Sequence, residues 1–333
     1  MKIKLEDKYF IFDKPINNSL KECLKTIYLY FRANFYKLYL IVAKKNQIKC
    51  KKYKVSICAI FKDESKYLKE WLEYHIIVGV DHFYLYNNCS SDEYDDVLQP
   101  YINQGIVTLI DWPYEQSQIQ AYENCIKCFS DESHWIGFID IDEFVVPIKT
   151  NNIYDFLQKY EKKYPAVLIY WRVFGTSGHI TSEQNELLTE KYFLAWEKLN
   201  NIGKCFYNTN FEYAFNNEKN ACLHHVFWGK VNNVAVPPIN CFGKITYYRL
   251  HLANKKEVPI QINHYVTKSL EDYYKKCEKS DVFFKENPRY HNRAFEIDLY
   301  STKPDYKIFR YMAKLKINMQ SNCQKENCET KNE

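Results

Sequence analysis

The segment HWIGFIDIDEF (His134–Phe144) decides the fold class, because it joins an apolar run to a group of closely spaced acids. The apolar run is typical of a buried strand, and the acids at its end are Asp140, Asp142 and Glu143. In a strand, residues two apart point to the same side, so the pattern places Asp140 and Asp142 on one face and Glu143 on the other. Two carboxylates this close repel each other. Either one of them therefore takes up a proton or a cation lies between them.

Earlier segments show the same β-rich, apolar character, and each is followed by residues with helical spacing. Strands are expected over residues 55–61, 82–86, 106–111 and 135–140. Helices are expected between them, over residues 66–78, after Asp92, and over 116–129. This alternation predicts a doubly wound α/β domain with a mostly parallel sheet. The carboxyl ends of parallel strands line the ligand crevice of such a sheet, and Asp140 and Asp142 fall at one of these ends.

The pattern is weaker beyond residue 150. It predicts a helix over residues 152–164, a strand over 166–174 and a helix over 270–279. The residues between are expected to form loops and short aromatic strands.

The chain has few glycines with which to bind a phosphate. It holds only 8, and neither G-x-G-x-x-G nor G-x-x-x-x-G-K-[ST] occurs in it. A divalent cation, Mg²⁺ or Mn²⁺, that bridges carboxylates to a diphosphate would do the same work by Lewis acidity. The acids could instead cap the next turn or pair with surface lysines, because a D-x-D triplet alone is weakly specific.

Composition narrows the class of protein. With 333 residues, 46% hydrophobic and 26% charged, the chain is typical of a globular protein with a large core. It has 12 cysteines and no signal-peptide pattern at its start, which indicates reduced thiols and a cytoplasmic location. A zinc site at Cys125 and Cys128, or at Cys222 and His225, is an alternative. The first pair falls within an expected helix, which favours structural thiols.

Residues 1–52 differ from the rest in charge and pattern. Residues 1–54 hold 14 Lys and Arg against 4 Asp and Glu, whereas the remainder carries a net charge of −5. Apolar residues recur here at the spacing of one helix face, and they are Leu20, Leu24, Ile27, Phe31, Phe35, Leu38 and Val42. Such a basic helix either rests on an anionic membrane surface or a partner, or packs on the main domain with its lysines in solvent. Arg32 and Lys37 interrupt the apolar run, so a membrane span is not expected.

Six segments of the chain, in order, resemble glycosyltransferases of the GT-A type. The closest resemblance is to family 92, once called a domain of unknown function, which includes β-galactosyltransferases. The matching segments are Ala59–Asp92, Leu98–Pro113, Gln120–Ile126, Trp135–Pro147 (WIGFIDIDEFVVP), Phe174–His179 (FGTSGH) and Asn263–Lys276 (NHYVTKSLEDYYKK). The resemblance implies a GT-A domain over residues 53–303, with a Rossmann-like, mostly parallel sheet flanked by helices. Residues 1–52 would form a basic helical extension, and residues 304–333 a polar, flexible tail.

The resemblance also implies a cation site. Asp140 and Asp142 would form the D-x-D motif that binds the metal and the donor, with Asp142 the more direct ligand. His264 would be the third ligand of Mn²⁺ or Mg²⁺, because a neutral imidazole suits Mn²⁺. Lys268 would neutralise charge on the leaving diphosphate. Lys204, His224 and His225 are further candidates.

Other positions match the part of GT-A enzymes that binds the nucleotide. They are Phe61, Lys62, Asp63 and Glu64 after the first strand, and Asn87 after the second. Many relatives carry Asp where Asn87 stands. A neutral amide still hydrogen-bonds a base edge, although with different geometry.

Inversion at a sugar carbon needs a carboxylate base for the acceptor hydroxyl. Glu183, Glu190 and Glu212 are candidates, and Glu190 is preferred because relatives carry a similar acid beside an aromatic residue. An acceptor sugar would stack on aromatic rings, for which the candidates are Trp171, Phe174, Trp196 and Trp228. Each of these aromatics is more often a core residue.

These observations predict a metal-dependent, inverting glycosyltransferase. It would move a hexose, with galactose favoured, from a UDP-sugar to a glycan or a lipid-linked saccharide such as a bacterial surface polysaccharide precursor. The alternatives are another donor, UDP-GlcNAc or UDP-glucose, and a non-catalytic nucleotide- or carbohydrate-binding protein of the same fold. Nucleic acid is not expected as a partner, because the acidic main domain offers no continuous basic track. The basic helix predicts a peripheral position on the inner face of the cytoplasmic membrane.

Overall fold

The computed structural model describes residues 10–11, 20–43, 47–182, 186–214, 225–247, 250–253, 257–278 and 287–329. Its first half alternates strands and helices as predicted. The elements are β2 (Tyr53–Phe61), α2 (Ser65–Ile77), β3 (His82–Asn87), α3 (Tyr94–Asn103), β4 (Val107–Asp111), α4 (Gln118–Phe129) and β5 (Ser133–Phe138). The predicted α/β class is therefore confirmed.

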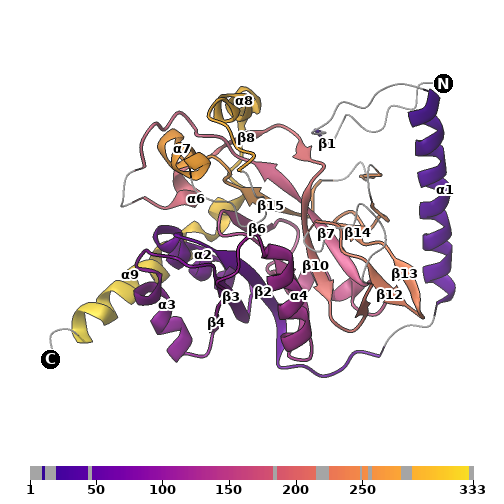
Figure 1. Cartoon of the computed structure of the whole chain (residues 1–333), viewed down its shortest axis with the longest axis horizontal. Coiled ribbons are helices and arrows are strands. Elements are labelled where there is room, and N and C mark those ends of the chain that lie inside the picture. Colours follow the sequence, from indigo (N-terminus) through magenta and orange to yellow (C-terminus); the bar gives the residue numbers. More distant parts are fainter. Residues whose placement is uncertain are drawn as a thin grey trace.

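The main sheet is parallel in one half and mixed in the other. The parallel half has the order β4-β3-β2-β5. The sheet continues through β10 (Gly203–Asn208), β7 (Ala166–Val173), β15 (Ile260–His264) and β6 (Glu143–Pro147), and β14 (Ile239–Asn240) pairs with β7. Strand β10 runs antiparallel to both β5 and β7, and β6 runs antiparallel to β15. Figure 1 shows this sheet through the middle of the molecule, with α2, α3 and α4 beside its parallel half.

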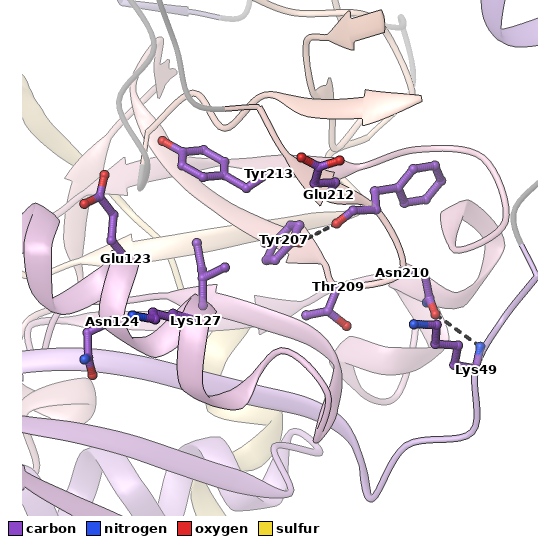
Figure 2. Close-up of a pocket in the computed structure, with 11 residues that line it drawn as sticks. Lys49, Glu123, Asn124, Lys127, Tyr207, Thr209, Asn210, Glu212 and Tyr213 are labelled. Atoms are coloured by element: carbon purple, nitrogen blue, oxygen red, sulfur yellow. Dashed lines mark hydrogen bonds between the residues drawn. The ribbon is translucent and has the colours of Figure 1, made fainter. Parts of the chain in front are cut away.

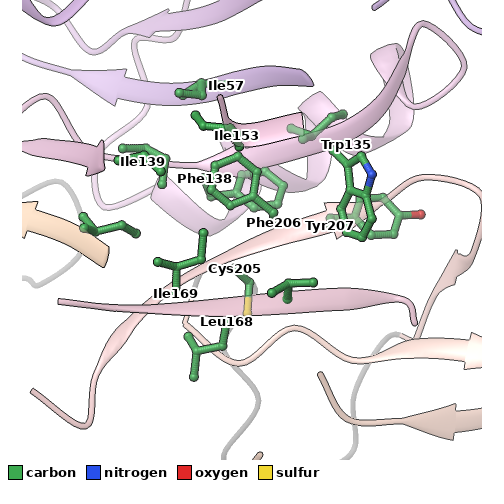
Figure 3. Packing of buried hydrophobic residues seen from close by; sticks show 14 of the residues in the cluster. Ile57, Trp135, Phe138, Ile139, Ile153, Leu168, Ile169, Cys205, Phe206 and Tyr207 are labelled. Atoms are coloured by element: carbon green, nitrogen blue, oxygen red, sulfur yellow. The ribbon is translucent and has the colours of Figure 1, made fainter. Parts of the chain in front are cut away.

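The parallel half folds around strands that are buried on both faces. In β2, every residue from Val55 to Phe61 is buried. The antiparallel strand β10 packs tightly on the strand that leads to the acids. The ring of Phe206 lies directly over Gly137, where an added Cβ would approach Cε1 of Phe206 to 2.5 Å. The glycine of the WIGF segment is thus needed so that β5 and β10 can pair, and Figure 3 shows the side chains that pack there.

Smaller elements surround the main sheet. Strands β11 (Glu212–Tyr213), β12 (Gly229–Val231) and β13 (Val234–Val236) form a three-stranded sheet, β8 (Leu194–Trp196) pairs with β16 (Ser301–Pro304), and β1 (Phe10–Ile11) pairs with β9 (Leu199–Asn200). The remaining helices of the second half are α5 (Ile153–Leu157), a 3-10 helix (Gln158–Tyr160), α6 (Leu188–Lys191), α7 (Leu270–Glu278) and α8 (Asn292–Tyr300).

Helix α1 (Leu20–Val42) lies along one edge of the molecule, beside β12 and β13 (Figure 1). The hydroxyl of Tyr39 donates to the carbonyl of Val231 at 2.7 Å, and that of Tyr247 donates to the carbonyl of Leu29 at 2.7 Å. The residues that the helix buries are Leu29, Ala33, Tyr36 and Leu40. The predicted helix is therefore present, but it packs on the domain through a different face from the apolar one read from its sequence.

The C-terminal region differs from the polar, flexible tail predicted from residue 304. A 3-10 helix (Lys307–Tyr311) leads directly into α9 (Met312–Glu329). Ile308, Tyr311 and Leu315 are buried, and the hydroxyl of Tyr311 donates to the carbonyl of Pro147 at 3.0 Å. Apolar residues at this spacing dock the start of the helix although the segment as a whole is polar.

Candidate active site

The acids of the opening segment lie in a turn between two strands, and not within one strand. Strand β5 ends at Phe138 and β6 begins at Glu143. The amide of Glu143 donates to the carbonyl of Asp140 at 3.0 Å, and the indole of Trp71 donates to the carbonyls of both residues. The predicted alternation of faces is therefore wrong. The turn brings Glu143 back toward its neighbours, so that its Oε2 accepts from the amide of Asp140 at 3.1 Å.

A carboxylate–imidazole cluster forms where β6 pairs with β15. The register places His264 opposite Glu143, and the amide of Tyr265 donates to the carbonyl of Asp142 at 2.9 Å. Nε2 of His264 lies 3.7 Å from Oδ1 of Asp142. Ligand atoms of Asp142, Glu143 and His264 all lie within 4.8 Å of one another. The structure thus brings together Asp142 and His264, as the family resemblance implied, and adds Glu143, which the face argument had excluded.

Asp140, which was predicted to bind the metal, contacts a buried lysine. Its Oδ2 accepts from Nζ of Lys204 at 2.7 Å, and its Oδ1 accepts from Tyr122 at 3.2 Å and Gln118 at 3.4 Å. Among the residues that the structure describes, Asp140 is not a member of the metal-binding group. The geometry assigns Asp140 to an ion pair with a buried lysine on β10.

The electrostatics of the cluster follow from burial and from nearby ammonium groups. Burial opposes ionisation of Asp142, but the charges of Lys276 and His264 outweigh it and hold the pKa of Asp142 well below its ordinary value. Burial raises the pKa of Glu143 well above its ordinary value, even though Lys204 opposes that shift. For Lys204, burial is outweighed by the charges of Asp140 and Glu143, so its pKa is raised. The pKa values of Asp142 and Glu143 are therefore shifted in opposite directions.

Lys268 and Glu64, both predicted to bind the donor, contact each other. Nζ of Lys268 lies 2.9 Å from Oε2 of Glu64 and 3.6 Å from the centre of the Tyr67 ring. The neighbouring residue Asp63 has a positive φ of 52°. Its side chain accepts from the amide of Ser91 at 2.8 Å. This strand-end loop is therefore held close to the segment that follows β15.

Among the other predicted donor-binding positions, Phe61 is buried and Lys62 lies beside it in the same loop. The ring of Phe61 packs edge-on against Tyr94 with centroids 5.6 Å apart. The Nδ2 of Asn87 donates to the hydroxyl of Tyr94 at 2.9 Å, and its Oδ1 accepts from the amide of Ser90 at 2.9 Å. The amide of Asn87 thus shapes the loop after β3.

The loop after β3 also contains a residue that sequence reasoning missed. Asn88 is buried, and its Nδ2 donates to the carbonyls of Trp112 and Tyr114 at 2.8 and 2.9 Å. In the sequence, the only signal for Asn88 was its position next to Asn87. Asn88 fixes the segment after β4 next to the predicted nucleotide site.

The structure does not bring Glu190 to the acidic cluster. Its carboxylate accepts from Nζ of Lys316 on α9 at 2.6 Å, and both side chains are 45% exposed. A general base must reach the acceptor hydroxyl beside the donor, so the geometry gives no support to Glu190 in that role. Glu212 pairs with Lys230 at an exposed site on β12, whereas Glu183 lies outside the described residues.

Two histidines were further candidates. His224 lies outside the described residues. Nδ1 of His225 donates to the carbonyl of Gly203 at 2.6 Å, and burial lowers the pKa of His225 to about 3. His225 therefore stays neutral, in a turn beside the start of β10.

Of the four aromatic candidates for acceptor contact, three are core residues. Phe174, Trp196 and Trp228 are buried. Trp171 is only partly buried, and its ring lies 4.4 Å from that of His264. Its indole Nε1 is buried and has no hydrogen-bond partner among the described residues. Trp171 is thus the aromatic residue that borders the cluster.

A separate pocket of about 660 Å³ lies at the other end of β10 (Figure 2). It is lined by α4 and by the segment from Tyr207 to Tyr213, and includes Glu123 and Lys127. The amide of Lys49 donates to Oδ1 of Asn210 at its edge at 3.2 Å. Because Lys204 begins β10 and Tyr207 nears its end, this hollow is distinct from the acidic cluster.

The residues of the cluster fit a divalent cation. Buried Oε1 of Glu143 and buried Nδ1 of His264 have no hydrogen-bond partner among the described residues. Two carboxylates with one imidazole are ligands that suit Mn²⁺, and carboxylates alone suit Mg²⁺. Nζ of Lys276 lies 2.5 Å from Asp142, so a cation here would share this carboxylate with an ammonium group.

The parallel half-sheet and the acidic turn at its strand ends define an α/β protein with acids at the carboxyl ends of its strands. The chain belongs to glycosyltransferase family 92, whose family model matches residues 51–303. A family 92 protein of Oryza sativa subsp. japonica is 31% identical over 114 residues, which are 34% of this chain and 20% of that protein. One of Ricinus communis is 32% identical over 95 residues, which are 28% of this chain and 17% of that protein. The chain thus spans about a fifth of the length of the curated relatives it matches.

Solved structures resemble the chain over less than half of its length. Residues 1–349 of S. aureus TarS, solved in complex with UDP, are 13% identical and cover 47% of each chain with a TM-score of 0.30. GalNAc-T7, solved with UDP, GalNAc and Mn²⁺, is 14% identical and covers 37% of this chain and 24% of that chain, with a TM-score of 0.28.

Proposed function

We propose that this protein is a metal-dependent, inverting glycosyltransferase that takes a hexose from a UDP-sugar. Its acceptor would be a glycan or a lipid-linked saccharide, such as a precursor of a bacterial surface polysaccharide. The observation that carries the proposal is the buried cluster of Asp142, Glu143 and His264 at the carboxyl ends of the parallel strands. Galactose is the favoured sugar, on the strength of the family resemblance.

The charges around the cluster match a nucleoside diphosphate. Lys276 contacts Asp142, and Lys268 adds a further positive charge that acts on the same carboxylate. Fixed ammonium groups stabilise the negative charge that develops on a leaving diphosphate. A divalent cation, when bound, would supply Lewis acidity to the same oxygens. Asp142, Glu143 and His264 are the residues that would hold it.

Neighbouring residues hold the turn that carries Asp142 and Glu143. Asp140 and Lys204 form an ion pair beneath the turn, and Trp71 ties both ends of the turn to α2. In this proposal the indole N–H of Trp171, which has no partner among the described residues, would donate to a sugar hydroxyl next to His264. The base is left unassigned, because Glu190 and Glu212 pair with surface lysines and Glu183 lies outside the described residues.

The test is calorimetric titration of UDP into the full chain with and without Mn²⁺, followed by a screen of UDP-galactose, UDP-GlcNAc and UDP-glucose for UDP release. We expect Mn²⁺ to tighten UDP binding in the wild type and not in Asp142→Asn. The matched control is Asp131→Asn, an exposed aspartate at the opposite end of β5, which should behave as wild type. Thermal unfolding of both variants checks that they are folded.

The outcomes separate the alternatives. UDP release from UDP-GlcNAc or UDP-glucose, but not from UDP-galactose, would change the donor and keep the enzyme class. Binding of UDP without release from any donor would indicate a non-catalytic binding protein. A UDP affinity that changes neither on addition of Mn²⁺ nor in Asp142→Asn would contradict the proposed cation site.

A further inference from the structure

Helix α1 has two apolar faces, and the rest of the described chain covers only one of them. The uncovered face, here called the outer stripe, consists of Leu20, Leu24, Ile27, Phe31, Phe35, Leu38 and Val42. We propose that the outer stripe is a docking surface for an anionic lipid bilayer, on which the helix lies parallel to the membrane plane.

The outer stripe is continuous and well exposed. Phe31 is 73% exposed and Val42 is 81% exposed, at positions near the middle and at the end of the helix. Residues at this spacing lie on one side of a helix, and 23 residues span about 34 Å. Isolated apolar residues on a surface need no explanation, but a contiguous apolar stripe of this length marks an interaction surface.

Rotation of α1 about its own axis cannot bury the outer stripe, because the opposite face of the helix is packed on the domain. Tyr36 packs edge-on against Trp228 and Tyr247, with ring centroids 5.8 and 6.3 Å apart. The guanidinium of Arg32 lies 5.7 Å from the Trp228 ring centre. Rotation would break these contacts together with the hydrogen bonds of Tyr39 and Tyr247 to backbone carbonyls.

The charge around the stripe favours an anionic surface as its occupant. Lys21 and Lys37 are exposed on α1, and Glu22 is the only acid in the sequence of the helix. On a helical wheel the two lysines fall on opposite borders of the stripe. This is the pattern of a helix that sits in the headgroup region, with its apolar side in the acyl boundary and lysines among anionic lipids.

A second copy of the chain fits this surface less well. Pairing of two stripes would bring together two segments that each hold 14 basic against 4 acidic residues, and like charges repel. No helix among the described residues is long and apolar enough to cross a membrane. The arrangement therefore indicates a helix that lies on a membrane.

The experiment is flotation of the full chain with vesicles of phosphatidylcholine alone or of phosphatidylcholine mixed with phosphatidylglycerol. We expect binding to the mixed vesicles that is much stronger than binding to the neutral ones. Phe31→Ser with Phe35→Ser should weaken the binding by at least about tenfold, since two aromatic side chains lose their apolar contact. Lys21→Gln with Lys37→Gln should weaken it by about fivefold for each charge removed, on mixed vesicles only.

The matched control changes two apolar residues on another helix. Phe295 and Leu299 of α8 are 51% and 75% exposed, and Phe295→Ser with Leu299→Ser should bind vesicles as wild type does. UDP binding by the outer-stripe variant should be unchanged, which separates this proposal from the proposed transfer activity. The proposal is overturned if the wild type does not float, or if the stripe variant floats as well as wild type. A dimer of the wild type that the outer-stripe variant cannot form, with no lipid binding by either protein, would also overturn the proposal.

Discussion

Nζ of Lys276 lies 2.5 Å from Oδ2 of Asp142, so that an ammonium group and the imidazole of His264 share one buried carboxylate. Lys276 contacts Oδ2 of Asp142, whereas His264 lies nearer to Oδ1. The charge of Lys276 keeps Asp142 ionised, and it also repels a second cation. Under the proposed function, the same side chain would contact the diphosphate of the donor.

Lys276→Ala should make cation binding tighter and nucleotide binding weaker. Removing a positive charge this close to Asp142 should raise Mn²⁺ affinity by roughly tenfold in the absence of nucleotide. The same change should lower UDP affinity in the presence of Mn²⁺, because an ammonium partner of the diphosphate is lost. Titration of Mn²⁺ followed by electron paramagnetic resonance, with and without UDP, measures both effects. Lys275→Ala is the matched control, because Lys275 is exposed and pairs with Glu271 one turn away; equal effects of the two substitutions would contradict this prediction.

Lys204→Met should destabilise the fold strongly. The side chain of Lys204 is 1% exposed and neutralises Asp140 at 2.7 Å and Glu143 at 3.8 Å. Removing the lysine leaves Asp140, whose side chain is 33% exposed, and buried Glu143 without their partner, which costs about 3 kcal/mol, the lower end of the cost of breaking a buried ion pair. Denaturant unfolding measures this loss. The control is Lys230→Met at the exposed pair with Glu212, where we expect a loss of less than about 1 kcal/mol.

The buried histidine His75 should make the protein sensitive to acid. Its Nδ1 contacts the carbonyl of Trp71 at 2.9 Å, and burial lowers its pKa to about 3. Between pH 6.5 and that value the unfolded chain binds a proton that the folded chain does not. The free energy of unfolding should therefore fall by about 1.4 kcal/mol for each pH unit below 6.5, owing to this residue. Denaturant unfolding at several pH values measures this. In His75→Gln the free energy of unfolding should fall by about 1.4 kcal/mol less per pH unit than in the wild type. An equal fall in the two proteins between pH 6.5 and 5 would contradict the role given to His75.

Glu190→Gln should leave transfer activity within about twofold of wild type, because neutralising a solvent-exposed ion pair changes little. The pair with Lys316 on α9 lies at the surface, with both side chains 45% exposed. Initial rates of UDP release, compared with those of Asp142→Asn, measure this. A loss for Glu190→Gln as large as that for Asp142→Asn would restore Glu190 as a base candidate.

The parallel half of the fold could be predicted because its signals are local. Strands β2, β3, β4 and β5 each begin and end within a few residues of their predicted ranges. Each is a run of apolar residues, and β2, β3 and β4 are each followed by a helix, so the order of these elements can be read from neighbouring residues. The D-x-D acids, His264 and Lys268 could also be named, because they fall in short motifs that resemble those of the family.

The remaining features depend on contacts between distant residues. The turn at Asp140 looks like a continuation of β5, since the apolar residues Ile139 and Ile141 keep the alternation going. Only the pairing of β6 with β15, from Glu143 to His264, shows that the chain has reversed there. Lys204 was only a secondary candidate in the sequence and Lys276 was not singled out, because a lysine acquires this role only when folding places it next to a buried carboxylate. The buried face of α1 was likewise hidden, since both of its faces are apolar.

The antiparallel pairing of β6 with β15 also means that the site is built from two distant parts of the sequence. The acids Asp142 and Glu143 belong to the N-terminal half of the chain. His264, which completes the set of ligands, lies more than a hundred residues later in the sequence. A fragment that stops short of β15 would carry the whole D-x-D segment and still lack a complete set of ligands. The proposed cation site is therefore complete only in the finished domain, and cation binding would report whether the two halves have joined.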